Sequence, residues 1–380
     1  MIKFQNKKNI AVAMSGGIDS SVAAFLLQKK HQVFGVTMYL GPFHKQAVKR
    51  AKIICQRLKI PHYIIDLEKE FRKEIIKPFI KEYCESKTPN PCVWCNQKIK
   101  FGYLLKAARN LGADYLATGH YACLRQEIRN SKSETLNKFK NINSKFKNIN
   151  KKNQNIYQLL KAKYKNRDQS YFLYRLSPEQ LKKIIFPLGN MSKRQVEKIA
   201  IQNNLCFPNQ KESREICFIP DNDYRKFLEK YSSYPPGPIK DLKGNTIGEH
   251  QGLPFYTIGQ RKGLVSGSKF PLYVVRIDKK ENTIILGLEK NLYQKQLIAK
   301  NIIWNEITTG SDLAHLPKPQ DITVKIRYQH RPAQISKIIF DEVEPHQVKI
   351  EFKKAQRAIT PGQSMVIYRG EQVLGGGIIV

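Results

Sequence analysis

The sequence predicts an α/β fold in which a doubly wound, mostly parallel sheet is followed by a small central domain and a C-terminal β-barrel. Short apolar runs alternate with helical stretches in roughly the first 200 residues, at the spacing of βαβ units. A proline-rich break follows at residues 234–238. Beyond about residue 272, runs with a period of two succeed one another with little helix between them. We therefore expect three domains, at residues 1–205, 206–275 and 276–380.

The bulk composition bounds the class of protein. A chain of 380 residues is too long for one ordinary core. Its 66 Lys and Arg residues against 31 Asp and Glu give a net charge of +35, which predicts attraction to a polyanion. No apolar run approaches the roughly 20 residues that span a bilayer, and the first eight residues lack the apolar core of a signal peptide. Seven scattered cysteines argue against a disulfide framework, so we expect a reducing, cytoplasmic location and no membrane partner.

The N-terminal half alternates between predicted strands and helices. Apolar runs predict strands at residues 9–13, 33–38, 62–66, 113–121 and 156–160, and amphipathic stretches predict helices at 22–30, 45–58, 68–87, 97–111 and 177–205. Pro89 and Pro91 lie two residues apart in the segment before residue 97. Because proline disfavours regular helix, we expect a stiffened loop there.

The remaining segments differ in composition and residue pattern. Residues 126–155 contain the hexapeptide Lys-Phe-Lys-Asn-Ile-Asn twice, and this low complexity predicts a disordered surface insertion. Glycine-rich polar runs at 248–252 and 257–264 are typical of loops. Alternating runs at 323–328 and 347–352 predict barrel strands.

The first strand-to-helix turn carries the clearest functional signal. There the chain reads Ser15-Gly16-Gly17-Ile18-Asp19-Ser20. Free backbone N–H groups and the helix dipole favour an anion at such a turn, and glycine lets the main chain approach a phosphate closely. The Gly-Lys-Ser/Thr sequence of the common P-loop is absent. Another predicted strand ends in Gly119-His120, at the edge where ligands bind in open α/β sheets.

The cysteines leave three interpretations open. They could be small buried hydrophobic residues, which suits Cys55, Cys84, Cys123 and Cys206 in their apolar surroundings. A zinc site is less favoured, because the Cys92-x-x-Cys95 pair has no second pair. Thiol chemistry is the interpretation we favour for Cys95 and Cys217, with Cys92 unsettled. We expect the dipole of the following helix, together with Lys98 and Lys100, to lower the pKa of Cys95.

A series of motifs then extends over nearly the whole chain, apart from residues 126–155. They are, in order, Ser-Gly-Gly-Ile-Asp-Ser, Thr-Pro-Asn-Pro-Cys-Val-Trp-Cys-Asn, Ala-Thr-Gly-His-Tyr, Arg-Asp-Gln-Ser-Tyr-Phe-Leu, Glu-Ile-Cys-Phe-Ile, Gly-Glu-His-Gln-Gly, Gly-Gln-Arg-Lys-Gly-Leu, Thr-Pro-Gly-Gln and Gly-Gly-Gly-Ile-Ile. In this order they closely resemble the tRNA-specific 2-thiouridylase family, the tRNA-uridine 2-sulfurtransferases. The first motif also resembles the signature of the PP-loop ATP pyrophosphatases, whose sheet belongs to the adenine nucleotide alpha hydrolase-like class.

The resemblance implies a two-step transferase reaction. The enzyme would use ATP and Mg²⁺ to adenylate the 2-carbonyl oxygen of the wobble uridine (position 34) of tRNA, releasing pyrophosphate. Sulfur would then come from a persulfide on Cys217, and Cys95 would act as the nucleophile that forms a disulfide with it. The positions that match the ATP-binding residues of the family are Ala13, Met14, Ser15, Gly16, Gly17, Ile18, Asp19, Ser20, Met38 and Gly119.

The resemblance also implies how tRNA is held. Positions that match target-base contacts are Asn90, Pro91 and Cys92, and positions that match tRNA contacts are His120, Arg167, Asp168, Gln169, Arg327, Tyr328 and Gln363. The implied partners are tRNAs of the Lys, Glu and Gln type and a persulfide donor, such as a cysteine desulfurase or a sulfur-relay protein.

This chain departs from many members of the family at several positions. Cys92 stands where many carry Asp, so Cys92, Cys95 and Cys217 offer three ligands for a [4Fe-4S] cluster as an alternative to a persulfide relay. Residues before Cys217 read Ser-Arg-Glu rather than Ser-Thr-Gly, and the segment between Met38 and Ala51 is short. Two rival functions are a PP-loop ligase for a small molecule and a non-catalytic RNA-binding protein. The first leaves the cysteines and the charge unexplained, and the intact phosphate loop argues against the second.

Overall fold

The computed structural model describes residues 6–129, 154–207, 216–219, 221, 223–231, 233–265, 268, 270–305, 318–341, 343–344 and 346–380. Its N-terminal domain is built on a five-stranded sheet in the order β3-β2-β1-β4-β7, and every neighbouring pair in it is parallel. The strands are β1 (Asn9–Ala13), β2 (Gln32–Tyr39), β3 (His62–Asp66), β4 (Tyr115–Ala117) and β7 (Ile184–Ile185). The strand order reverses between β1 and β4, and ligands bind at such a switch point in open α/β sheets.

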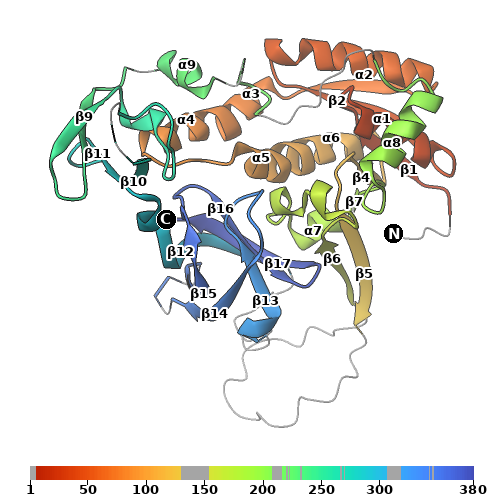
Figure 1. Cartoon of the computed structure of the whole chain (residues 1–380). Helices are drawn as coiled ribbons and strands as arrows, with labels where there is room; N and C mark the ends of the chain where they lie inside the picture. The colour runs from red at the N-terminus through yellow and green to blue at the C-terminus, as the bar shows by residue number, and fades with distance from the viewer. Residues whose placement is uncertain are drawn as a thin grey trace, which may run out of the picture.

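Helices cover both faces of this sheet because the strand residues alternate between two cores. Ile10 and Val12 of β1 belong to the core shared with α1 (Ile18–Gln28), α2 (Lys45–Arg57) and α8 (Lys193–Gln202). Ala11 belongs to the opposite core. The helices there are α3 (Glu68–Phe71), α4 (Lys77–Cys84), α5 (Pro91–Trp94), α6 (Leu105–Asn110) and α7 (Pro178–Leu181), with the π-helical segments η2 (Arg72–Ile76) and η3 (Cys95–Leu104). In Figure 1, α2 lies at the top of the molecule, and α5, α6 and α7 lie between the sheet and the barrel.

A small antiparallel-rich sheet forms the centre of the chain, in the order β10-β11-β8-β9. Its strands are β8 (Gly237–Lys240), β9 (Thr246–His250), β10 (Tyr273–Asp278) and β11 (Thr283–Gly287), and the helix α9 (Tyr224–Glu229) precedes them in the chain. The boundary expected between residues 275 and 276 falls inside β10.

The C-terminal strands form a closed antiparallel barrel in the order β12-β15-β14-β13-β16-β17, with β17 pairing back to β12. The strands are β12 (Tyr293–Trp304), β13 (Ile322–Lys325), β14 (Ala333–Phe340), β15 (Val348–Arg357), β16 (Ser364–Arg369) and β17 (Gln372–Ile379). The predicted fold class is therefore confirmed. The hairpin of β5 (Cys123–Arg129) and β6 (Gln154–Leu160) extends the same sheet from the N-terminal domain. Short 3-10 turns complete the described elements at Pro42–His44, Lys165–Arg167, Ser170–Phe172, Leu253–Phe255, Glu289–Leu292 and Pro319–Asp321.

The barrel is joined to the N-terminal domain by hydrogen bonds as well as by this hairpin. The Thr88 N–H donates to the Pro361 carbonyl over 2.8 Å, and the Tyr171 hydroxyl donates to the Ser364 carbonyl over 2.8 Å. Tyr171 and Tyr174 are both completely buried.

Four sequence-based expectations about local structure are corrected. A helix begins at Pro91, where proline is favoured because the first N–H of a helix needs no partner, so Cys92 and Cys95 lie on a helix and not on a loop. Residues 177–205 contain two helices with the short strand β7 between them. The run at 248–252 belongs largely to β9. Both ends of the stretch 126–155 are strand, and its middle, residues 130–153, lies outside the described residues. Within the described ranges, no helix has the length and apolar character needed to cross a membrane.

Candidate active site

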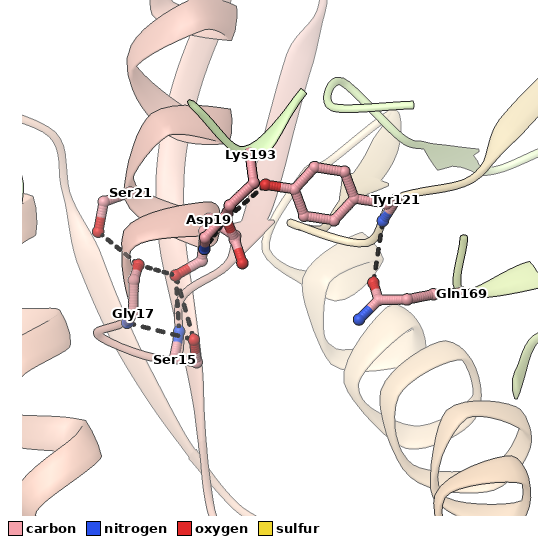
Figure 2. Close-up of polar contacts among 8 residues, drawn as sticks. Ser15, Gly17, Asp19, Ser21, Tyr121, Gln169 and Lys193 are labelled. Atoms are coloured by element: carbon pink, nitrogen blue, oxygen red, sulfur yellow. Dashed lines mark hydrogen bonds and ion pairs between the residues drawn. The ribbon is translucent and has the colours of Figure 1, made fainter. Parts of the chain in front are cut away.

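The turn between β1 and α1 is a closely hydrogen-bonded loop. The Met14 N–H donates to the Val36 carbonyl over 2.8 Å, which holds the start of the loop against β2. The Ser20 hydroxyl donates to the Gly17 carbonyl over 3.0 Å, and the Ser15 N–H donates to the Ser20 oxygen over 3.2 Å. Figure 2 shows the hydrogen bonds among Ser15, Gly17 and the first turn of α1 that close the loop. The loop is thus preorganised before any ligand is bound.

Two glycines allow the elements around this loop to approach closely. Gly16 has φ of +70°, and a Cβ there would lie 2.6 Å from Arg50 Cβ and 2.8 Å from the Ala47 carbonyl oxygen of α2. A Cβ on Gly119 would lie 2.7 Å from the Ser20 backbone nitrogen. Gly119 follows β4, so the end of β4 packs directly on the N-terminus of α1. Met38 lies near the end of β2, the other neighbour of β1, so the strands that carry Met38 and lead to Gly119 lie on either side of β1.

Asp19, in the first turn of α1, is the centre of a polar network that the sequence did not indicate. The Tyr121 hydroxyl donates to Asp19 Oδ1 over 2.8 Å, and Lys193 Nζ pairs with the same oxygen over 2.9 Å (Figure 2). The Lys193 side chain is 9% exposed and that of Asp19 is 34% exposed. Tyr121 and Gln169 hold each other by two hydrogen bonds, between Tyr121 N and Gln169 Oε1 and between Gln169 N and the Tyr121 carbonyl.

One sequence signal could have identified Lys193. Ser192 caps α8 with a complete capping box, which makes Lys193 the first residue of the helix. A cation at that position opposes the helix dipole, and α8 has no acidic residue in its first turn. Such an unfavourable placement indicates that an anion near the helix N-terminus compensates it.

The thiols Cys92 and Cys95 share one face of the helix that begins at Pro91. They are three residues apart, which places them on one side of a helix. From Cys95 the helix is π-helical, and this geometry joins residues i and i+5, so Lys100 lies one turn beyond Cys95 on the same face. In a regular α-helix, Lys100 would be rotated by about 140° from Cys95.

Cys217, from a distant part of the chain, lies near Cys92 and Cys95, and the three residues are called the thiol cluster here. Its neighbour Phe218 is buried and packs edge-to-face on Phe71 and Phe79, with ring centroids 5.6 and 5.2 Å apart. This packing anchors the exposed Cys217 beside the helix that carries Cys95. The motif residues 212–215 lie outside the described residues.

The electrostatics of the cluster differ from the sequence expectation. Burial raises the pKa of Cys95 to about 12; Lys100 opposes this shift, while the neighbouring thiols Cys217 and Cys92 add to it. Although the surface of Cys217 is accessible, the residue lies among densely packed segments, and desolvation raises the pKa of its thiol to about 11. Cys92 adds to this rise and Lys100 opposes it. The pKa of Cys92 is also raised by burial. The expected lowering of the Cys95 pKa is therefore wrong, because Cys95 is in the second turn of a buried helix rather than at its exposed N-terminus.

Lys100 also acts on two histidines that follow strands of the parallel sheet. Desolvation holds the pKa of His120 well below its usual value, and the charge of Lys100 lowers it further. His44 lies just after β2. Its pKa is lowered by desolvation and by the charges of Lys100 and Arg50. Lys98, by contrast, faces away: it pairs with Glu74 over 2.6 Å.

The residues expected to contact the target base lie at the start of the helix that begins at Pro91 and carries Cys92 and Cys95. Asn90 precedes its first turn, Pro91 is buried and Cys92 is half-buried.

Most residues expected to contact tRNA make contacts inside the protein. Asp168 is buried and accepts hydrogen bonds from Ala162 N, Ser170 N and the Ser170 hydroxyl. Arg327 donates to the Arg357 carbonyl over 3.0 Å. His120 is hydrogen-bonded to Thr118, and Gln363 donates to the Thr88 carbonyl. The Tyr328 ring packs on the Phe172 ring. Arg167 is half-buried.

The three thiols do not form a metal site in this arrangement. In the part of the chain that the structure describes, no group of three or more His, Cys, Asp or Glu side chains is placed to hold a metal ion. The donor set for a [4Fe-4S] cluster is therefore not assembled. All seven cysteines are free thiols.

Comparison with known proteins agrees with this architecture along the whole chain. Family models match residues 8–221 as a tRNA methyl transferase HUP domain, residues 225–288 as a tRNA methyl transferase PRC-barrel domain and residues 294–379 as an aminomethyltransferase beta-barrel domain. The chain is 41% identical to the tRNA-specific 2-thiouridylase MnmA of Halothermothrix orenii, covering 97% of this chain and 98% of that protein. It is 40% identical to the protein of the same name from Heliobacterium modesticaldum (98% and 93% covered) and 40% identical to that from Clostridioides difficile (99% and 99% covered). The chain therefore belongs to the tRNA-specific 2-thiouridylase family.

Proposed function

We propose that this protein catalyses the ATP-dependent 2-thiolation of the wobble uridine (position 34) of tRNA, giving 2-thiouridine, AMP and pyrophosphate. One observation carries the proposal. Cys217, from a distant part of the sequence, lies close enough to Cys95 to raise the pKa of that thiol, and Lys100 lowers the pKa of both thiols and of His120, the neighbour of Gly119. This proximity supports a reaction that joins sulfur chemistry at the thiols to a nucleotide held at the β1–α1 turn.

The first step activates the uridine. The 2-carbonyl oxygen attacks the α-phosphorus of ATP, the bond to the β-phosphate breaks, and pyrophosphate leaves. The loop from Ala13 to Ser20 would hold the phosphates by its N–H groups at the N-terminus of α1. Mg²⁺ fits beside this loop, because Asp19 Oδ2 is a carboxylate oxygen with no hydrogen-bond partner among the described residues. When bound, Mg²⁺ supplies charge neutralisation for the departing pyrophosphate.

The second step transfers sulfur. The terminal sulfur of a persulfide on Cys217 attacks C2 of the adenylated base, and AMP leaves with the former 2-oxygen. The Cys95 thiol then attacks Sγ of Cys217, the S–S bond to the base sulfur breaks, and the proton of Cys95 passes to the pyrimidine that leaves. The products are 2-thiouridine and a disulfide between Cys95 and Cys217, which a thiol reductant must reduce. With pKa values of about 12 and about 11, both free thiols are protonated at neutral pH, which disfavours premature disulfide formation.

The substrate and donor are proposed on chemical grounds. The chain has 66 basic and 31 acidic residues, and this positive charge favours a polyanionic substrate. A uridine must leave its base stack before it can be adenylated. We place the flipped base at Asn90, Pro91 and Cys92, next to the thiols. Further partners are tRNAs of the Lys, Glu and Gln type and a protein that delivers persulfide sulfur. We route no step through an iron–sulfur cluster, because the thiols are not arranged as its ligands.

Cysteine variants test this function directly. Cys95→Ser and Cys217→Ser should each abolish thiolation of a wobble-uridine tRNA supplied with ATP and a persulfide donor, while tRNA binding is retained. Cys206→Ser is the matched control, because Cys206 is another free, half-buried thiol outside the cluster. Near-normal sulfur transfer by either active-site variant would contradict the assigned roles. Pyrophosphate release without tRNA would instead favour a small-molecule ligase.

A further inference from the structure

The thiol helix, which begins at Pro91, has π geometry over the ten residues 95–104. At its end the Leu105 N–H donates to the Lys100 carbonyl, five residues earlier. This spacing places Lys100 on the face that carries Cys95, whereas α-helical spacing would turn it away by about 140°. The placement of the lysine relative to the thiol therefore depends on the π geometry.

Gln180 of α7 binds this π-helical segment from outside the helix. Its Nε2 donates to the Gln97 carbonyl over 2.9 Å and to the Phe101 carbonyl over 2.7 Å. Its Oε1 accepts from the Ser177 N–H over 2.9 Å in the capping box of α7, which fixes the orientation of the amide. A π-helix is rare and is mostly a single turn. A segment of ten π-helical residues is therefore expected to depend on external contacts such as these.

Arg175 holds the same part of the helix through different groups. It is buried, its Nε donates to Gln97 Oε1 over 3.0 Å, and its guanidinium lies 4.2 Å from the centroid of the Trp94 ring. Gln97 lies between Cys95 and Lys100 in the chain, and it is bound both through its carbonyl and through its side chain. The turn of helix that separates the thiol from the lysine is thus fixed from outside.

We propose that Gln180 is a positioning residue for the thiol chemistry: its two hydrogen bonds hold the π-helical register of residues 95–104 and keep the Lys100 ammonium beside the thiol cluster. This role rests on the proposed function, because the same thiols carry the sulfur. Without the two hydrogen bonds the segment relaxes toward α geometry, in which Lys100 no longer shares a face with Cys95. A cation near the thiols favours their ionised form, so its withdrawal makes them less reactive.

Alkylation of Cys217 by iodoacetamide at pH 9, quantified on the labelled peptide by mass spectrometry, reports the charge near the thiols. Gln180→Met should slow this reaction by about 3- to 10-fold, as removal of the Lys100 charge itself should. Gln195→Met is the matched control. Gln195 occupies the same capping-box position in α8 and accepts from the Ser192 N–H over 2.8 Å, but among the described residues its amide donates to no carbonyl. The rate of this variant should stay within about twofold of the wild-type rate.

A double variant shows whether Gln180 acts through Lys100. Combined with Lys100→Met, Gln180→Met should slow alkylation no further, because the charge that it positions is already gone. The proposal is overturned if Gln180→Met reacts like the wild type, or if it slows the reaction equally in the Lys100→Met background, as a general loosening of the structure would. Gln180→Glu replaces Gln180→Met if the latter does not fold, since its carboxylate still accepts from Ser177 but donates to neither carbonyl.

Failure of the proposed function has a different signature, because the alkylation assay needs neither ATP nor tRNA. In that case the wild type would show alkylation that depends on Gln180 yet would transfer no sulfur to tRNA.

Discussion

Gly16 offers the sharpest test of how the phosphate loop is built. Its φ of +70° is a left-handed conformation that alanine adopts only with strain, and a Cβ there would lie within 3 Å of two backbone atoms of α2, the Ala47 oxygen and the Ala51 nitrogen. Gly17, the next residue, has φ of −91°, and a Cβ there would meet only the Ser15 hydroxyl at 3.3 Å. Gly16→Ala and Gly17→Ala are thus a matched pair.

The expected magnitudes follow from these geometries. For Gly16→Ala, the left-handed conformation costs about 1–2 kcal/mol and overpacking against a helix backbone costs about 1–3 kcal/mol. Reduced freedom of the unfolded chain offsets about 0.4–1 kcal/mol of this. The free energy of unfolding should therefore fall by about 3 kcal/mol. For Gly17→Ala, the same offset roughly cancels a small loss at the helix N-cap, so the change should be near zero.

Thermal unfolding followed by circular dichroism measures the difference. A loss of about 3 kcal/mol lowers the midpoint by about 6–12 °C for a domain of this size. ATP binding to Gly16→Ala should weaken in parallel, because the loop must move away from α2. Equal midpoints for the two variants would refute the argument that Gly16 is fixed by its contact with α2.

Three further predictions concern charge. Lys100→Met should slow alkylation of Cys217 at pH 9 by about 3- to 10-fold, because loss of the cation raises the thiol pKa, whereas Lys98→Met should not; equal rates in the two variants would contradict the placement of Lys100. Affinity for tRNA in a filter-binding assay should fall by about 100-fold or more between about 50 and 200 mM salt, and a salt-insensitive complex would count against a basic tRNA surface. Arg175→Met should lower the free energy of unfolding in urea by about 2–4 kcal/mol, because the buried guanidinium donates to the Asn301 carbonyl; a change below about 0.5 kcal/mol would show that this contact is dispensable.

The sequence predicted the sheet and the turn between β1 and α1 because each signal there is local. Apolar strand, glycine turn and amphipathic helix follow one another within about 20 residues, and the loop from Ala13 to Ser20 lies where this order places it. The start of the thiol helix was mispredicted for a local reason as well. Pro91 disrupts the interior of a helix but favours its first turn, and the choice depends on where the neighbouring hydrogen bonds begin.

Other features depend on contacts between distant segments and could not be predicted from local patterns. Lys193 meets Asp19 only because α8 packs beside α1. The raised pKa of Cys95 arises from burial and from the approach of Cys217, which is distant in the sequence, whereas the sequence showed only the neighbouring lysines. Strand β7 has two residues, too few for any periodicity to be visible.

The barrel contacts side chains that are buried in the N-terminal domain, so it contributes to the packing of that domain. A chain truncated after residue 293 would bare the aromatic rings of Tyr171 and Tyr174, which are now wholly covered. It would also remove the pairing of Gln372 in β17 with Leu160 in β6, which exposes the outer edge of β6. Loss of the barrel should therefore destabilise the N-terminal domain as well as remove the barrel strands themselves.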